Sequence, residues 1–296
     1  MYKSIAEFVK QAMTEEVSIA ELMIRQEIEE TGFSRKEIID GMRKNLEIMK
    51  EASQRGVSGD GVFSPTGLTG GDAVKMAEYR KKGQTLSGDA MLKGVQMAMA
   101  TNEVNAAMGR VCATPTAGST GTLPGVLMSI TETLNLSEEQ ELDFLFTAAL
   151  FGLIVANNAM IAGAVGGCQA EVGSASAMGA AAAVAVAGGT PLQSAEAFSM
   201  ALGNLLGLVC DPVAGLVEIP CVKRNTVGAA NALICADMAL AGIENKIPAD
   251  EAIQAMKEVG EAMPSTLRET GLGGFAATPT GIQMKMRVFG NEMNNN

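Results

Sequence analysis

The chain has 296 residues, of which 47% are hydrophobic, 4% aromatic and 19% charged. A chain of this length buries roughly 75% of the surface that its unfolded form exposes, so it can carry one large core. Its 33 acidic and 22 basic residues give a net charge of −11, which argues against a nucleic-acid partner because phosphate backbones require a basic face. Strand-forming aromatic residues are scarce, whereas Ala and Met are abundant. We therefore predict a single all-α domain over residues 1–296.

The hydropathy pattern indicates a cytoplasmic protein. Residues 1–12 carry three charged side chains where a signal peptide would need an apolar run. The most apolar stretch, residues 145–165, is interrupted by Asn157 and Asn158, which favours a buried helix over a membrane span. A membrane protein is the weakest alternative.

Several helix beginnings can be predicted in chain order. Ser34 and Glu37 have the spacing of a capping box, followed by apolar residues at helical intervals up to residue 49. A further helix is expected to begin near Asp72, whose charge would cap or favour the positive helix end. Capping boxes also begin at residues 137 and 190, and residues 246–250 form a late connector before a short helix.

Two segments rich in Gly, Pro and Thr, residues 56–71 and 113–125, interrupt this helical pattern. Long loops between helices are uncommon and are often functional. Backbone N–H groups in such loops, or at the helix start near Asp72, can form an anion-binding nest, and hydroxyl groups add further donors. Tight turns with ordinary capping are the alternative for each hydroxyl. The candidate residues for binding a substrate carboxylate are Ser64, Thr66, Gly70, Gly71, Thr116, Gly118, Ser119 and Thr120.

The chain has no histidine, which removes the commonest general base and the commonest metal ligand. It has five cysteines, and in an acidic protein of expected cytoplasmic location these indicate metal binding or catalysis rather than a disulfide framework. Helix breakers flank Cys168, Cys210 and Cys221, so their side chains can point away from packed helix faces. Cys235 is expected at an interior position of a helix, and both Cys235 and Cys112 are expected to be packed as small hydrophobic residues.

The residues alone leave two interpretations of the three flanked cysteines open: a metal site or simple burial. No C-x2-C pair is present, so neither a zinc ribbon nor a ferredoxin-type cluster is indicated. A [4Fe–4S] cluster normally takes four cysteines, so one held by three would leave an iron open to act as a Lewis acid.

Four segments together resemble a known family. They are residues 64–72 (SPTGLTGGD), 114–121 (TPTAGSTG), 167–173 (GCQAEVG) and 210–225 (CDPVAGLVEIPCVKRN). Through these segments the chain resembles the α subunit of the iron–sulfur-dependent L-serine dehydratases, in the two-subunit form of Gram-positive bacteria. The resemblance extends over essentially the whole chain.

The resemblance implies a helical domain whose Gly-rich loops gather around an iron–sulfur site, and a β subunit with an ACT-like region as partner in a hetero-oligomer. A [4Fe–4S] cluster would be held by Cys168, Cys210 and Cys221. The implied reaction is that of a lyase in amino-acid catabolism and gluconeogenesis, which dehydrates and deaminates L-serine to pyruvate and ammonia. The open iron would act on the substrate hydroxyl. Pyridoxal phosphate is not implied, because no lysine has a recognisable Schiff-base context.

Glu171 and Lys223 are the candidates within this chain for the base that takes the α proton, and Glu171, three residues after Cys168, is preferred. A structural salt bridge is the alternative for both. In the resembled family a Ser- and His-containing motif belongs to the β portion, which is a further source of the base.

The chain departs from the family pattern in two places. It ends in Asn294, Asn295 and Asn296, where some single-chain relatives carry a cysteine that reaches the cluster. It also has Ala-Gly-Ser at residues 117–119, where the family often has Asn-Gly-Ala. Two other functions stay open: a dehydratase of another hydroxy acid with the same cluster, and a non-catalytic metal scaffold or redox sensor.

Overall fold

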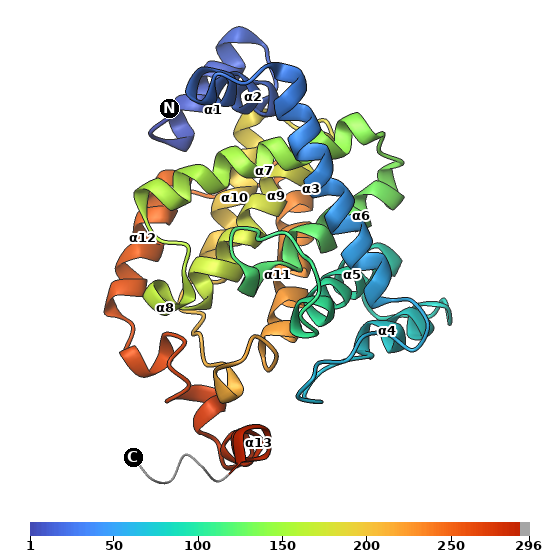
Figure 1. The fold of residues 1–296 in the computed structure, drawn as a ribbon. Helices are drawn as coiled ribbons and strands as arrows, with labels where there is room; N and C mark the ends of the chain where they lie inside the picture. Colours follow the sequence, from blue (N-terminus) through green and yellow to red (C-terminus); the bar gives the residue numbers. More distant parts are fainter. Residues whose placement is uncertain (291–296) are drawn as a thin grey trace.

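The computed structural model describes residues 1–290. In this range thirteen α-helices are joined by short 3₁₀ and π turns, and the only β-structure is two isolated β-bridges (Figure 1). The all-α prediction is confirmed. Residues 291–296, which include Asn294, Asn295 and Asn296, lie outside the described range. No helix in the described range is long and apolar enough to span a membrane. The α-helices are α1 (Ile5–Glu15), α2 (Ile19–Thr31), α3 (Arg35–Gly56), α4 (Asp72–Arg80), α5 (Asp89–Ala106), α6 (Thr122–Leu134), α7 (Glu138–Asn158), α8 (Gly163–Gly166), α9 (Ser174–Val186), α10 (Pro191–Asn204), α11 (Cys221–Leu240), α12 (Ala249–Ala262) and α13 (Pro279–Phe289).

Helix α9 lies at the centre of the core. Every residue from 174 to 184 is buried, and most of them are Ala, Ser or Gly. Helices α6, α7, α10 and α11 pack around it (Figure 1). A helix that is apolar on all sides belongs inside a protein. The π-helical turn η2 (Gln169–Gly173) leads directly into α9, so the segment around Cys168 and Glu171 is also buried.

The predicted capping boxes are confirmed. The Ser34 hydroxyl accepts the backbone N–H of Glu37 at the start of α3. Complete capping boxes also begin α7 and α10, at the predicted positions. Each box satisfies N–H groups that have no partner inside the helix.

Helix α4 begins at Asp72 as predicted. Of the two roles expected for Asp72, capping is not observed, but its charge lies in the first turn, at the positive helix end. The first N–H groups are bound by Glu103 of α5, which accepts from the backbone of Asp72 at 2.7 Å and of Ala73 at 3.3 Å. One sequence expectation needs correction. The second Gly-rich segment ends at residue 121 rather than 125, since α6 includes Pro124 in its first turn, where a missing N–H breaks no intrahelical bond.

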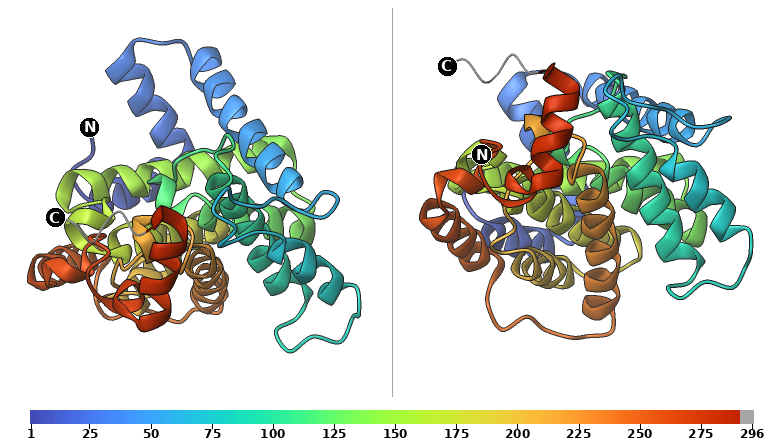
Figure 2. Two further views of the ribbon diagram at one scale, coloured as in Figure 1. Left: turned by 60° about the horizontal axis from the view of Figure 1, so that its bottom comes forward. Right: turned by 90° about the horizontal axis from the view of Figure 1, so that it is seen from below.

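The two ends of the described chain lie at opposite ends of the helical bundle. Helices α1 and α2 form one end, and α13 lies at the other, near the loops that precede α11 and the short helix α8 (Figure 1). Turning that end forward brings α13 in front of the bundle (Figure 2). The cysteine-bearing loops before η2 and α11 therefore lie at the end of the molecule that carries α13.

Candidate metal centre and active site

Three cysteines from separate elements converge at this end. Cys168 precedes η2, Cys210 follows α10 in a loop, and Cys221 is the first residue of α11. Their exposed fractions are 3%, 3% and 6%. Ligand atoms of Cys168, Cys210 and Glu171 all lie within 4.8 Å of one another. Cys221 is buried at the start of α11, a helix that contacts η2. The fold therefore gathers two sulfur atoms and a carboxylate in one buried site, with a third buried cysteine on an adjoining helix.

Backbone hydrogen bonds hold the Cys168 and Cys210 segments together. The backbone N–H of Gln169 donates to the carbonyl of Leu208 at 2.9 Å. The backbone N–H of Cys210 donates to the carbonyl of Leu267 at 2.8 Å, and the carbonyl of Cys210 accepts the N–H of Glu269 at 2.6 Å. The Cys210 loop is thus fixed between the start of η2 and a C-terminal segment more than fifty residues later.

A buried ion pair borders the cysteines. Arg224 Nη1 lies 2.5 Å from Asp211 Oδ1 and 2.7 Å from the carbonyl oxygen of Val209. The other Asp211 oxygen accepts the backbone N–H of Phe275 at 2.7 Å. A largely buried pair of this kind requires such additional hydrogen bonds to offset the loss of hydration. Both residues lie within the segment 210–225, but the sequence alone predicts no role for them.

The thiols of Cys210 and Cys221 favour the protonated form. Burial raises the pKa of Cys221, and charge on Cys168 and Glu171 adds to the rise, while Arg224 opposes it. The pKa of Cys210 is raised first by its hydrogen bond with Cys168 and then by burial. Thiolates are the form that binds metal, so metal binding here would release protons. A buried set of soft sulfur donors suits an iron–sulfur centre or zinc rather than magnesium or calcium.

Glu171 is confined beside the sulfur atoms. Its carboxylate is 7% exposed and accepts a hydrogen bond from Thr116 Oγ1 at 2.6 Å. Burial raises its pKa, and the hydrogen bonds from Thr116 and from the Gly163 backbone oppose that rise. A Cβ atom on Gly118 or Gly163 would lie 2.7 or 2.6 Å from a Glu171 carboxylate oxygen. Both glycines therefore leave the space that this carboxylate occupies.

The hydroxyls of Ser119 and Thr120 bind nearby backbone carbonyls, whereas the buried hydroxyl of Thr114 has no hydrogen-bond partner among the described residues. Ser119 Oγ donates to the carbonyl of Thr114 at 2.8 Å, and Thr120 Oγ1 donates to the carbonyl of Cys112. Both side chains are completely buried. Each hydroxyl has one proton to donate, so Ser119 and Thr120 shape the loop and do not present a donor to a ligand in this structure.

Asn225 connects the same loop to the cysteine-bearing helix. Its Oδ1 accepts the backbone N–H groups of Gly121 and Thr122 at 3.1 and 3.0 Å, and its Nδ2 donates to the carbonyl of Gly118 at 2.8 Å. Asn225 is fully buried and lies one turn after Cys221. Sequence reasoning assigned no role to this residue, because its partners are about a hundred positions away.

The 64–72 loop lies against the residues before α11. Ser64 and Thr66 hydroxyls are 3.0 Å apart, and Thr66 donates to Glu218 at 2.8 Å. Gly70 and Gly71 have φ values of 142° and 73°, a region that favours glycine. A Cβ on Gly70 would lie 2.6 Å from the Cα of Phe63. Both glycines thus close the turn of the loop.

Lys223 is placed differently from Glu171. Its side chain is 58% exposed, and its Nζ lies 2.5 Å from Asp72 Oδ2. An ammonium group in an ion pair has no free lone pair with which to accept a proton. Of the two candidates for the base, the geometry therefore favours Glu171.

The two remaining cysteines lie apart from the metal-ligand group. Cys235 is completely buried in α11, and burial raises its pKa to about 11. Cys112 is half-buried, and this burial also raises its pKa. Its Sγ contacts the backbone oxygen of Asn45 at 3.5 Å. It lines a mainly apolar cavity of about 520 Å³ beside α2, α3 and α7. These surroundings fit the packing roles expected of both.

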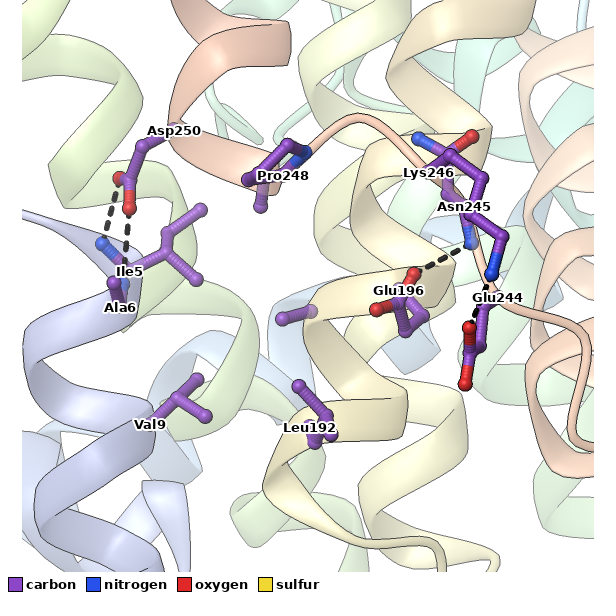
Figure 3. Close-up of a pocket in the computed structure, with 12 residues that line it drawn as sticks. Ile5, Ala6, Val9, Leu192, Glu196, Glu244, Asn245, Lys246, Pro248 and Asp250 are labelled. Atoms are coloured by element: carbon purple, nitrogen blue, oxygen red, sulfur yellow. Dashed lines mark hydrogen bonds and ion pairs between the residues drawn. The ribbon is translucent and has the colours of Figure 1, made fainter.

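A second cavity lies between α1, α10 and the connector before α12 (Figure 3). Its volume is about 360 Å³. The polar groups on its rim have partners in the protein: Asp250 accepts the N–H groups of Ile5 and Ala6, and Glu196 accepts that of Asn245. It contains none of the cysteines. This cavity therefore marks a helix junction rather than the candidate active site.

Comparison with known proteins identifies the family. Residues 14–276 match the family described as serine dehydratase alpha chain. The chain is 57% identical to a probable L-serine dehydratase, alpha chain, of Bacillus subtilis, over 98% of this chain and 96% of that protein. It is 42% identical to the L-serine dehydratase, alpha chain, of Peptoniphilus asaccharolyticus, over 91% and 92%. An L-serine dehydratase of Streptomyces coelicolor is 36% identical over 91% of this chain but only 59% of its own length. These names describe lyases, and the chain belongs to the serine dehydratase alpha chain family.

Proposed function

We propose that this chain is the [4Fe–4S]-carrying α subunit of a cytoplasmic L-serine dehydratase, which converts L-serine to pyruvate and ammonia. The observation that carries the proposal is the buried group of Cys168, Cys210 and Glu171, whose ligand atoms lie within 4.8 Å of one another. Cys221 is buried on the adjoining helix α11, and relatives of the chain are named L-serine dehydratases. The domain extends over residues 1–296.

The residues fit the cluster that the resemblance implies. Cys168, Cys210 and Cys221 would hold it, because their thiols are buried together and no disulfide consumes them. When held by three thiolates, a [4Fe–4S] cluster supplies one iron with an open coordination position and hence Lewis-acid assistance to the departure of the serine hydroxyl. Pyridoxal phosphate has no part in this proposal.

Glu171 would take the α proton of serine. A general base works best with a pKa near the operating pH, and burial raises that of Glu171 toward this range. The Thr116 hydroxyl holds one carboxylate oxygen, and Gly163 leaves space for the group beside Cys210. Loss of the α proton and of hydroxide gives aminoacrylate, whose imine tautomer hydrolyses to pyruvate and ammonia.

The Gly-rich loops would receive the serine carboxylate. The hydroxyls of Thr66, Thr116, Ser119 and Thr120 already donate to protein oxygens. The backbone N–H groups of Ser64 and Gly71 also donate, to the carbonyls of Thr69 and Val62. The donors left for the anion-binding nest expected from the sequence are therefore the backbone N–H groups of Gly70 and Gly118.

A β subunit would complete the enzyme as a hetero-oligomer. Two of the relatives above are named as an alpha chain, which implies a second chain. The Streptomyces coelicolor relative is named without a chain designation and is matched over only 59% of its length. This chain contributes no histidine, so any imidazole in the active site would come from such a partner.

The test is serine-dependent pyruvate formation after anaerobic iron–sulfide reconstitution, with and without the β subunit. We expect two effects in each of the variants Cys168→Ala, Cys210→Ala and Cys221→Ala. The visible absorbance of the cluster should disappear, and activity should fall by at least about 10²-fold. Cys235→Ala, at a buried position in the middle of α11, is the matched control and should keep both. A complex that binds the cluster but leaves serine unchanged would instead indicate another hydroxy acid, and retained activity in the three variants would contradict the ligand assignment.

A further inference from the structure

Glu218 is a buried carboxylate beneath the Gly-rich loop formed by residues 64–71. It is 4% exposed and lies three residues before Cys221. Thr66 Oγ1 donates to it and lies 2.8 Å from one carboxylate oxygen and 3.0 Å from the other. Thr69 Oγ1 lies 2.9 Å from the second oxygen. Two hydroxyls from one loop are thus directed at a single carboxylate about 150 positions away in the sequence.

These hydroxyls are the visible stabilisation of that carboxylate. Among residues 1–290, Glu218 makes no salt bridge with Lys or Arg. A buried carboxylate without hydrogen-bond donors is strongly unfavourable, so Thr66 and Thr69 are needed where they lie. In return, Glu218 fixes the position of the loop that carries them.

The carboxylate is anchored to the start of the cysteine helix. The backbone carbonyl of Glu218 accepts the N–H of Val222 at 3.0 Å, so Glu218 lies immediately before the first turn of α11. At the other end of the loop, Glu103 binds the first N–H groups of α4. The loop is therefore held at two points, and the one formed by Glu218 connects it directly to the segment that carries Cys221.

We propose that Glu218 is a positioning residue for the dehydratase reaction, which holds residues 64–71 beside the cysteine site so that the loop backbone can receive the carboxylate of L-serine. The inference rests on the proposed function, because it takes this loop as part of the serine site. The opposing interpretation is that Glu218 occupies the anion position itself and must leave before serine binds. Removing a positioning group raises KM for serine, whereas removing an internal competitor lowers it.

The experiment uses the reconstituted complex with its β subunit and compares Glu218→Gln and Thr69→Val with wild type. Each variant should raise KM for L-serine by about tenfold or more, the effect of losing a hydrogen bond to a charged group, and change kcat less. Cluster absorbance should be unchanged. Thr69→Ser keeps the hydroxyl and should restore a KM close to that of wild type.

The chain offers a matched control. Thr131 of α6 donates to the buried Glu141 of α7 at 3.2 Å, a threonine–carboxylate hydrogen bond between two other elements, although Glu141 also pairs with Lys50. Thr131→Val should leave KM for serine unchanged. Backbone hydrogen exchange in residues 64–71 should become faster in Glu218→Gln and Thr69→Val but not in Thr131→Val.

The outcomes separate this inference from the proposed function. An unchanged KM in Glu218→Gln and Thr69→Val would overturn it, and a lowered KM would establish the internal competitor instead. If wild type forms no pyruvate, the proposed function fails, while unchanged hydrogen exchange in the loop would overturn the role of Glu218 independently of activity.

Discussion

The two Gly- and Thr-rich loops have similar composition but different relations to a carboxylate. In the 64–72 loop, two hydroxyls are directed at Glu218, and a second acid, Glu103, binds the helix start that follows. In the 114–121 loop, one hydroxyl, that of Thr116, reaches Glu171, which also accepts from the Gly163 backbone. Both donors of Glu218 thus come from its loop, whereas Glu171 receives one from its loop and lies beside two cysteines.

This difference shows that loop composition does not decide loop function. Both loops offer hydroxyls and flexible backbone, as the sequence indicates. The acidic residue that the fold brings to each loop decides what those groups do. Glu218 accepts both hydroxyls from its loop next to the start of α11, whereas burial beside two cysteines raises the pKa of Glu171, which suits proton transfer.

The largest expected effect concerns the carboxylate beside the cysteines. Glu171→Gln keeps the size of the side chain but cannot take a proton, so kcat should fall by about 10²–10⁴-fold, the usual contribution of a general base. The measurement is pyruvate formation by the reconstituted complex at matched cluster content. Activity equal to that of wild type would remove the contrast between the loops and assign the base to the β subunit.

A smaller effect is expected from displacing that carboxylate without changing it. Gly163→Ala places a Cβ 2.6 Å from Glu171 Oε2 and 3.1 Å from Cys210 Sγ, so activity should fall by about 10²-fold, as small displacements of a reacting group can cause. Gly203→Ala is the matched control, since it is also helical and its Cβ would meet no atom within 4 Å. If both variants behaved like wild type, the position of Glu171 would not matter for turnover.

The smallest effect is a pH dependence of stability at the first loop. Burial raises the pKa of Glu103 above its ordinary value of 4.5, so the folded state binds more protons than the unfolded state just above this pH, and stability falls as pH rises through that window. Glu103→Gln does not titrate. Its Tm relative to wild type should therefore increase as pH rises above about 4.5, with roughly 2–4 °C for each ~1 kcal/mol. A difference in Tm that is constant with pH would contradict this prediction.

Much of the fold could be predicted because its signals are local. The capping boxes at Ser34, Ser137 and Thr190 begin α3, α7 and α10 as expected, since a cap depends on residues three positions apart. The helix-breaking residues beside Cys168, Cys210 and Cys221 are local signals of the same kind. The start of α4 near Asp72 was also predicted, but its capping partner Glu103 comes from α5, and no local pattern reveals it.

The candidate site was predictable in part. The cysteines and Glu171 stand out by residue type and by the segments that resemble the family, and the fold brings Cys168, Cys210 and Glu171 within 4.8 Å. The supporting residues Arg224 and Asn225 lie within those segments, but their partners could not be identified. Asn225 binds Gly121, which is far away in the chain, and Arg224 binds Asp211, which lies in an irregular loop.

The sequence by itself determined the all-α class, the helix beginnings and the family, because periodicity, capping and motif identity are properties of neighbouring residues. Only the tertiary structure decided which hydroxyls remain available and which carboxylates are held in place. Glu218 and Thr69 are 149 positions apart, and they meet because of how the core helices pack around α9. A buried polar group takes whichever partner that packing provides, and the sequence does not specify this partner in advance.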